Sequence, residues 1–267
     1  MKKQSLLWKI SKENHSPSYV FGTMHVQDQR VFNILDELTL IIDNCQAFAT
    51  EFNLDEADPA KAAAASTLPE GQSLVDILSK KQLKQTSRLL DKNFNLAIEN
   101  FYQQKPITLS NFLTMMVFQQ DQSLSLDETL FALAKEKNKQ LVGLETFDDQ
   151  LAIMKNMKMK MQIKQLMGIV KDYKKFKKSL NNLTNLYVEG RVHQLYQMSK
   201  KGMGKLKKPL LYDRNITMAN EFDKVVQEQT LFCAIGAGHL SGKKGVLKLL
   251  KDKGYKVKPV KLKGKIA

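Results

Sequence analysis

The chain has 267 residues, of which 43% are hydrophobic, so it is long enough to enclose a large core. Its formal net charge of +15 suggests a nucleic acid, an anionic surface or an acidic substrate as a partner. We favour a solvated lysine-rich surface over a nucleic-acid-binding one, because the aromatic motifs of single-strand binders are missing. An anionic surface stays a possible partner of this basic face. Cys45 and Cys233 are too few for a disulfide framework, so they are expected to be buried thiols.

The sequence lacks a secretory signal and any stretch of about 18 apolar residues, so a cytoplasmic location is expected. Near the N-terminus, apolar runs at residues 6–10 and 18–22 flank a polar turn cluster, which predicts a β-hairpin. Helical spacing follows over residues 31–44, and a short strand at 46–52 carries Glu51 near its end. The opening therefore predicts an α/β unit.

A long helical region is predicted over about residues 73–229, interrupted by a strand at 140–145 that ends in Glu145. Within it, Asp127 is expected to cap a helix over residues 128–138. A helix over 214–229 then leads into the apolar run at 230–235, and a lysine-alternating edge strand is predicted near 255–260. We expect one domain, 1–267, with a mixed central sheet of short strands and a large helical insertion.

Two apolar strands end in the same pattern, Gly-x-x-His, as Gly22 to His25 and Gly236 to His239. A single histidine after a strand is usually a hydrogen-bonded structural residue. Two in matching contexts favour a shared site, because sites in α/β proteins form at the carboxyl ends of strands. Glycine before each histidine would let the chain turn tightly and a ligand approach.

Glu51 and Glu145 stand at two further strand ends, although each alone could be a cap or a salt-bridge partner. Two imidazoles and a carboxylate form the ligand set of a divalent transition metal such as Mn, Co or Zn. We expect His25, His239 and a glutamate to bind the metal, with the other glutamate as general base; the residues do not assign the order. Arg214 would bind a substrate carboxylate or an oxyanion, or pair with a site carboxylate.

Five segments carry a family likeness, in chain order: Phe21-Gly-Thr-Met-His25, the strand ending in Glu51, Gly143-Leu-Glu145-Thr146, Arg214-Asn215-x-x-Met218-Ala219 and Gly236-Ala-Gly-His239. They resemble the TraB/PrgY/GumN family, to which the animal Tiki metalloproteases are related. The resemblance implies an erythromycin-esterase/ChaN-like fold with helices covering the site. It also implies a metal-dependent peptidase whose site residues are His25, Glu51, Glu145, Arg214 and His239, and therefore a peptide or protein substrate.

The sequence leaves two alternatives to a metal-dependent hydrolase. A non-catalytic regulatory protein could hold a peptide or haem iron between the same two histidines. A nucleic-acid binder would rely on the +15 charge alone, and we expect no specific nucleic-acid site because no motif for one is present.

Overall fold

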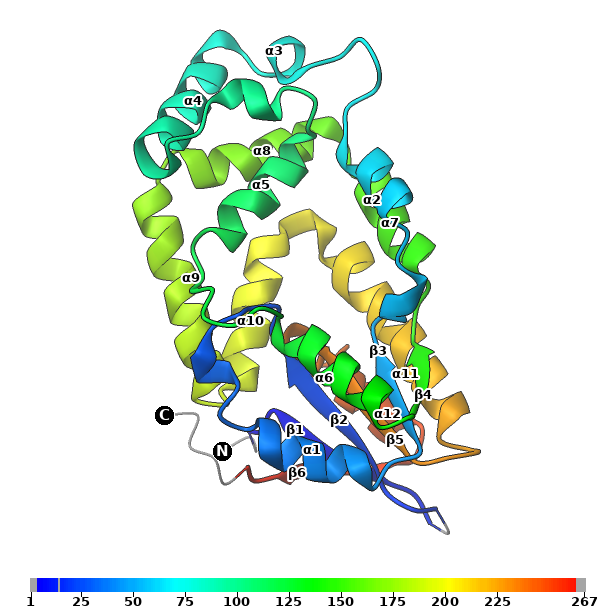
Figure 1. The fold of residues 1–267 in the computed structure, drawn as a ribbon. Helices are drawn as coiled ribbons and strands as arrows, with labels where there is room; N and C mark the ends of the chain where they lie inside the picture. The colour runs from blue at the N-terminus through cyan, green and yellow to red at the C-terminus, as the bar shows by residue number, and fades with distance from the viewer. Residues whose placement is uncertain (1–3, 14, 263–267) are drawn as a thin grey trace. The chain divides into compact units, whose positions relative to one another are not determined.

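The structure is a computed structural model, which describes residues 4–13 and 15–262. Its chain forms two compact units, one of residues 1–56, 119–147 and 182–267, and one of residues 57–118 and 148–181. The first unit contains the sheet and the second is helical (Figure 1). The prediction of a mixed α/β fold is confirmed, and the prediction of one domain over 1–267 stays a prediction.

One sheet of six strands organises the first unit, in the order β4-β3-β5-β2-β1-β6. The strands are β1 (Leu7–Ser11), β2 (Ser18–Thr23), β3 (Ala47–Thr50), β4 (Gln140–Gly143), β5 (Leu231–Gly236) and β6 (Lys256–Val260). Strands β4, β3, β5 and β2 run parallel, while β1 is antiparallel to both β2 and β6. The predicted N-terminal hairpin is therefore confirmed, and so is the edge strand near the C-terminus.

The two central strands explain why their sequences read as continuous apolar runs. Strands β2 and β5 are buried on both faces, as parallel strands covered by helices require. Phe48 of β3 and Phe232 of β5 are paired in register, and their rings stack with centroids 5.8 Å apart. Burial of each such ring contributes about 1.5–3 kcal/mol, so this stack fixes the neighbouring order of β3 and β5.

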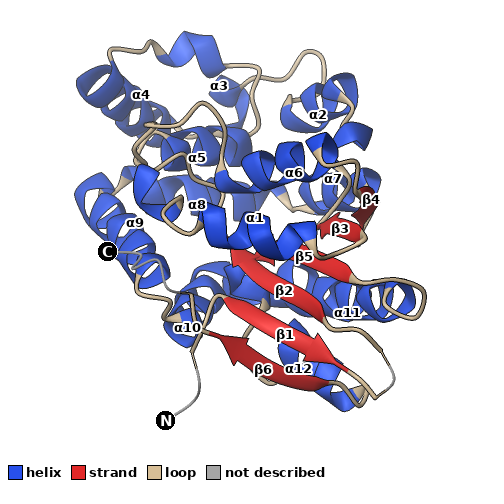
Figure 2. Ribbon diagram, turned by 60° about the horizontal axis from the view of Figure 1, so that its bottom comes forward, coloured by secondary structure: helices blue, strands red, loops and turns tan. Residues whose placement is uncertain are grey.

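Helices cover both faces of this sheet (Figure 2). They are α1 (Leu35–Asp43) and α6 (Leu126–Glu136) on one face, with α11 (Asp213–Val225) and α12 (Val246–Asp252) on the other. Helix α10 (Val192–Met203) packs on the turn η6 (Ala237–His239) that follows β5. The helix predicted from residue 31 begins only at Leu35, because Asp28 caps a separate 3-10 turn, η1 (Gln29–Val31).

The second unit is built from helices around its own apolar cluster. It contains α2 (Pro59–Ser66), α3 (Leu74–Ile77), α4 (Lys80–Phe94), α5 (Pro106–Met115) and α8 (Met159–Val170), and the division between the units passes through α7 (Phe147–Asn156) and α9 (Tyr173–Val188). Its short 3-10 turn is η3 (Ile98–Phe101). The first unit contains the turns η2 (Leu54–Glu56) and η4 (Gly204–Leu206) and the π-helix η5 (Lys208–Tyr212). Leu90, Leu109 and Leu166 are fully buried in the cluster, where α8 packs on α4 and α5.

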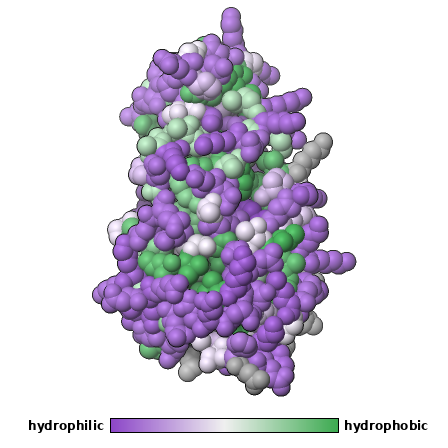
Figure 3. Space-filling view, turned by 90° about the vertical axis from the view of Figure 1, so that its right-hand side faces the viewer, coloured by the Kyte–Doolittle hydropathy of each residue, from purple (hydrophilic) through white to green (hydrophobic). Residues whose placement is uncertain are grey.

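The surface agrees with the lysine-rich composition. Hydrophilic side chains cover most of the face in Figure 3, with hydrophobic groups gathered between them. No helix in the described part of the chain combines the length and the apolar character needed to span a membrane. Both cysteines are buried free thiols, as expected.

Candidate functional site

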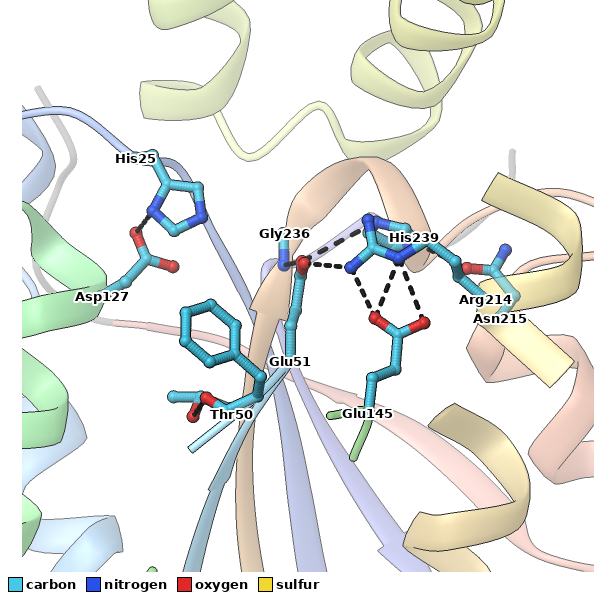
Figure 4. Close-up of polar contacts among 10 residues, drawn as sticks. His25, Thr50, Glu51, Asp127, Glu145, Arg214, Asn215, Gly236 and His239 are labelled. Carbon is cyan, nitrogen blue, oxygen red and sulfur yellow. Dashed lines mark hydrogen bonds and ion pairs between the residues drawn. The ribbon is translucent and has the colours of Figure 1, made fainter. Parts of the chain in front are cut away.

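The four parallel strands end at one edge of the sheet, and the predicted site residues gather there (Figure 4). The two Gly-x-x-His strands are direct neighbours, since Thr23 of β2 pairs with Gly236 of β5. The four residues follow the strand ends in this way: His25 after β2, Glu51 after β3, Glu145 after β4 and His239 after β5. Parallel strands place their carboxyl ends together, so segments distant in sequence meet at one site.

Arg214, in the first turn of α11, bridges the two glutamates. Its Nη2 lies 2.5 Å from Glu51 Oε2 and 2.6 Å from Glu145 Oε2, and its Nε donates to both oxygens of Glu145 at 2.9–3.1 Å. All three side chains are at least 84% buried, so water screens these ion pairs only weakly. Of the roles considered for Arg214, the structure shows it paired with the site carboxylates.

Glu51 also contacts β5, and Gly236 makes that contact geometrically feasible. The Gly236 N–H donates to Glu51 Oε1 at 2.9 Å, and a Cβ on Gly236 would lie 3.1 Å from the same oxygen. Burial by itself raises the pKa of the Glu51 carboxyl. At the acidic pH where Glu51 titrates, positive charge on His239, Arg214 and His25 outweighs this effect, so the pKa lies well below its usual value. Glu51 is therefore a carboxylate at neutral pH.

Gly22 is required for a different close approach. A Cβ there would lie 2.6 Å from Leu240 Cδ1 and 3.0 Å from the Ala237 backbone. The Gly22 carbonyl also accepts a hydrogen bond of 2.8 Å from the hydroxyl of Tyr187, which is fully buried. These contacts fix the end of β2 against the turn that carries His239.

His239 is held in one orientation by Asn215, the neighbour of Arg214 on α11. The Asn215 amide nitrogen donates to the Lys244 carbonyl at 2.6 Å, so its oxygen faces His239 Nδ1, also at 2.6 Å. That oxygen can only accept, which places the proton on Nδ1 and leaves a lone pair on Nε2. Nε2 lies 3.7 Å from Glu51 Oε1. Burial lowers the pKa of His239 to about 4, so the imidazole is neutral at pH 7. At this pH the negative charge of Glu51 is therefore stabilised by the positive charges of Arg214 and His25.

His25 also turns its Nδ1 to a side-chain oxygen, but its partner and its exposure differ from those of His239. Its Nδ1 lies 3.0 Å from Asp127 Oδ2, and its other ring nitrogen is turned toward Glu51 (Figure 4). The His25 side chain is 68% exposed, whereas that of His239 is 9% exposed. The charge of Asp127 raises the pKa of His25 to about 9. The metal-free protein therefore favours the charged form of this imidazole.

Asp127 is the functional residue that the sequence analysis missed. It was predicted to cap a helix, but Ser125 caps α6 through a reciprocal capping box with Glu128. Asp127 lies one position inside the helix, where its carboxylate is free to face His25. The pattern Ser-x-x-Glu at 125–128 is the signal that could have shown this, since it places the cap two residues earlier.

The charges and donor types at this edge suit a cation. Two buried carboxylates, Glu51 and Glu145, share the single guanidinium of Arg214, which leaves one net negative charge beside the Nε2 lone pair of His239. Within residues 4–13 and 15–262, no three His, Cys, Asp or Glu side chains are gathered as a metal-binding group. In donor chemistry, His25, His239 and Glu51 nevertheless fit a divalent metal, because both imidazoles turn Nδ1 to an outer oxygen, as metal-ligating histidines do.

Comparisons with known proteins show that the chain is similar to proteins named as TIKI metalloproteases. Metalloprotease TIKI2 of Danio rerio is 23% identical over 317 residues, covering 95% of this chain and 60% of that protein. Metalloprotease TIKI1 of Danio rerio is 24% identical over 315 residues, covering 95% and 62%. The Metalloprotease TIKI homolog of Amphimedon queenslandica is 22% identical over 312 residues, covering 95% and 61%. This chain thus spans about three fifths of these relatives.

No solved structure matches the chain significantly, so the likeness to the erythromycin-esterase/ChaN-like fold stays a prediction. A family model, in contrast, matches residues 6–259, which extend from β1 into β6 and include all five predicted site residues. The chain therefore belongs to the TraB/PrgY/gumN family.

Proposed function

We propose that this protein is a metal-dependent peptidase, with a divalent transition metal held by His25, His239 and Glu51. The observation that carries the proposal is the geometry of His239. Asn215 takes the proton-bearing Nδ1, so the Nε2 lone pair faces a carboxylate oxygen at 3.7 Å. Two electron-rich atoms that face each other in a buried site favour a cation between them. The protease names of the TIKI relatives support a peptide or protein as the substrate.

The protein's own residues would have separate tasks in this proposal. Asn215 and Asp127 orient the two imidazoles, and Gly236 orients the Glu51 carboxylate through its backbone N–H. Arg214 and Glu145 form the buried ion pair that fixes the second oxygen of Glu51. A bound divalent ion would supply Lewis-acid chemistry that polarises a peptide carbonyl.

This assignment makes Glu51 the carboxylate ligand and Glu145 a positioning residue. The Glu145 carboxylate accepts three hydrogen bonds from Arg214, whereas Glu51 Oε1 faces His239. Mn, Co and Zn all accept this mixture of imidazole and carboxylate donors. Because His25 is favoured in its charged form without a metal, metal binding at that ring would release a proton.

The test is metal analysis of protein purified without chelator, followed by cleavage of a peptide library with Mn²⁺, Co²⁺ or Zn²⁺ added. We expect about one bound ion per chain and cleavage that is lost on chelation and in His239→Ala. His15→Ala is the matched control, since His15 is an exposed residue outside the site. Protein that binds no metal and cleaves no peptide would refute the proposal, and metal binding without cleavage would favour the non-catalytic alternative.

A further inference from the structure

A cavity lies in the first unit, away from the strand ends that form the candidate site. It has a volume of about 420 Å³ and is lined by β1, β6, α12, the segment that follows His239, and His193 of α10. Pockets of 300–1,000 Å³ are typical of sites for small molecules. None of the five predicted site residues lines it, so it is a separate feature of the molecule.

The floor of this cavity is apolar. It is formed by Trp8 of β1, Val257 of β6, and Leu240 and Leu247 from the segment that includes α12. The only indole donor, the Nε1–H of Trp8, is already bonded to the Ser5 carbonyl at 2.7 Å. The tryptophan therefore presents ring surface to the cavity and no unmet polar group, which suits a hydrocarbon chain.

The rim of the cavity is cationic. Lys243, Lys248 and Lys251 line it, and no aspartate or glutamate is among its lining residues. Lys248 is paired with Asp252 on the same helix. Lys243 and Lys251 have no ion-pair partner within the described part of the chain. Two unpaired ammonium groups beside an apolar floor complement a ligand with one anionic end and one apolar end.

We propose that this cavity binds a single-chain amphipathic anion, such as a medium-chain fatty acid, with its tail on Trp8 and its head group between Lys243 and Lys251. The lysine rim selects the charge of the head group, and the apolar floor selects the tail. The volume accommodates one such chain and not a two-chain lipid. Binding would contact the segment that directly follows His239, since Leu240 is part of the floor.

Trp8 makes the proposal directly measurable, because it is the only tryptophan in the chain. The experiment titrates dodecanoate, below its micelle concentration and at low salt, into the full chain while tryptophan fluorescence is recorded. We expect a saturable change that fits one site. Dodecyltrimethylammonium, with the same tail and the opposite charge, and acetate, with no tail, should give no saturable change.

Two kinds of variant locate the ligand. The double variant Lys243→Glu/Lys251→Glu should weaken dodecanoate binding by about tenfold, which is about 1.4 kcal/mol, because it reverses two charges at the rim. Lys81→Glu/Lys84→Glu, the same charge change on exposed positions of α4, should bind as wild type does. Val257→Phe should block binding by filling the cavity, with circular dichroism confirming that the variant is folded.

The outcomes separate the proposal from its alternatives. Equal binding by wild type and the Lys243→Glu/Lys251→Glu variant would overturn it, as would equal responses to dodecanoate and the cationic detergent. A response to vesicles of anionic two-chain lipid with none to dodecanoate would also overturn it, and would assign the lysines to a membrane surface.

Discussion

Asn215 should control both the stability of the protein and its affinity for a metal, through a single hydrogen-bonded chain. Its side chain is fully buried, donates to the Lys244 carbonyl and accepts from His239 Nδ1, each over 2.6 Å. Asn215→Ala would leave one buried carbonyl and one buried imidazole N–H without partners. Each unsatisfied group costs about 1–3 kcal/mol, so we expect the free energy of unfolding to fall by about 2–6 kcal/mol.

The effect on metal affinity has a different cause and can be separated from the loss of stability. Without the asparagine oxygen, His239 is free to place its proton on Nε2, which removes the lone pair that faces Glu51. Loss of such an outer contact typically lowers metal affinity by about 10–100-fold. Asn215→Asp keeps an acceptor for Nδ1–H and loses only the donor to Lys244, so it should recover most of the affinity but not the stability.

The assay combines three measurements on the same proteins. Urea denaturation gives the stability, calorimetric titration with Zn²⁺ or Mn²⁺ gives the affinity, and ¹⁵N chemical shifts of the metal-free protein show which imidazole nitrogen carries the proton. Asn44→Ala is the matched control, since Asn44 bonds the Leu40 carbonyl at the other end of β3. The reasoning is refuted if Asn215→Ala keeps the wild-type tautomer of His239 and the wild-type metal affinity.

Three further predictions follow from the contacts of the site and of α11. Arg214→Ala should lower the free energy of unfolding by about 3–5 kcal/mol, because it removes the guanidinium that pairs with two buried carboxylates; urea denaturation measures this. Gly236→Ala should weaken metal binding with little loss of secondary structure, because its Cβ would stand 3.1 Å from Glu51 Oε1; calorimetry and circular dichroism measure the two effects. Asp223→Asn should lower stability by about 1 kcal/mol at pH 7, since the neutral amide loses the ion pair with Lys253 Nζ at 3.0 Å and accepts a weaker hydrogen bond from the Tyr255 hydroxyl. The difference from wild type should disappear at low pH.

The sign of the last prediction follows from the pKa of Asp223. Burial raises this pKa, but the hydrogen bonds from Tyr255 and Lys253 outweigh it, so the folded-state pKa is lower than the unfolded one. The stabilisation is present above the unfolded-state value, about 3.9, and is lost as pH falls through the folded-state value. A difference between wild type and Asp223→Asn that grows below pH 4 would contradict this. Equal stability of Arg214→Ala and wild type, or unchanged metal affinity in Gly236→Ala, would contradict the other two.

The parts of the fold that the sequence predicted are those that depend on local pattern. Apolar runs that end in glycine or in a polar residue mark strands and their ends, and the register of β2 with β5 confirms that the two Gly-x-x-His segments are neighbours. Strands β1 and β2 form the predicted hairpin for the same reason. Once β3 and β4 are parallel neighbours, their ends place Glu51 and Glu145 at the same edge of the sheet.

The parts that were not predicted depend on contacts between distant segments. Arg214 lies 163 residues from Glu51 and 69 from Glu145, and no local pattern encodes which carboxylate it will meet. The two histidines share a motif but differ in exposure. His239 sits in a turn packed under α10, whereas His25 lies in a loop and contacts Asp127 of α6. Identical motifs thus acquire different environments from the helices that happen to cover them.

The distribution of charge shows why the net charge of the chain was a poor guide to the site. The chain carries +15 overall, which suggests an anionic partner, yet at the strand ends two carboxylates share one guanidinium. Many of the lysines lie elsewhere: at the rim of the cavity beside Trp8, and along a groove in the helical unit that is lined by Lys92, Lys174, Lys177 and Lys178. A buried negative site favours a cation through short-range contacts that water does not screen, whereas exposed lysines act through a screened field. The candidate site and the lysine-rich surface therefore select ligands of opposite charge.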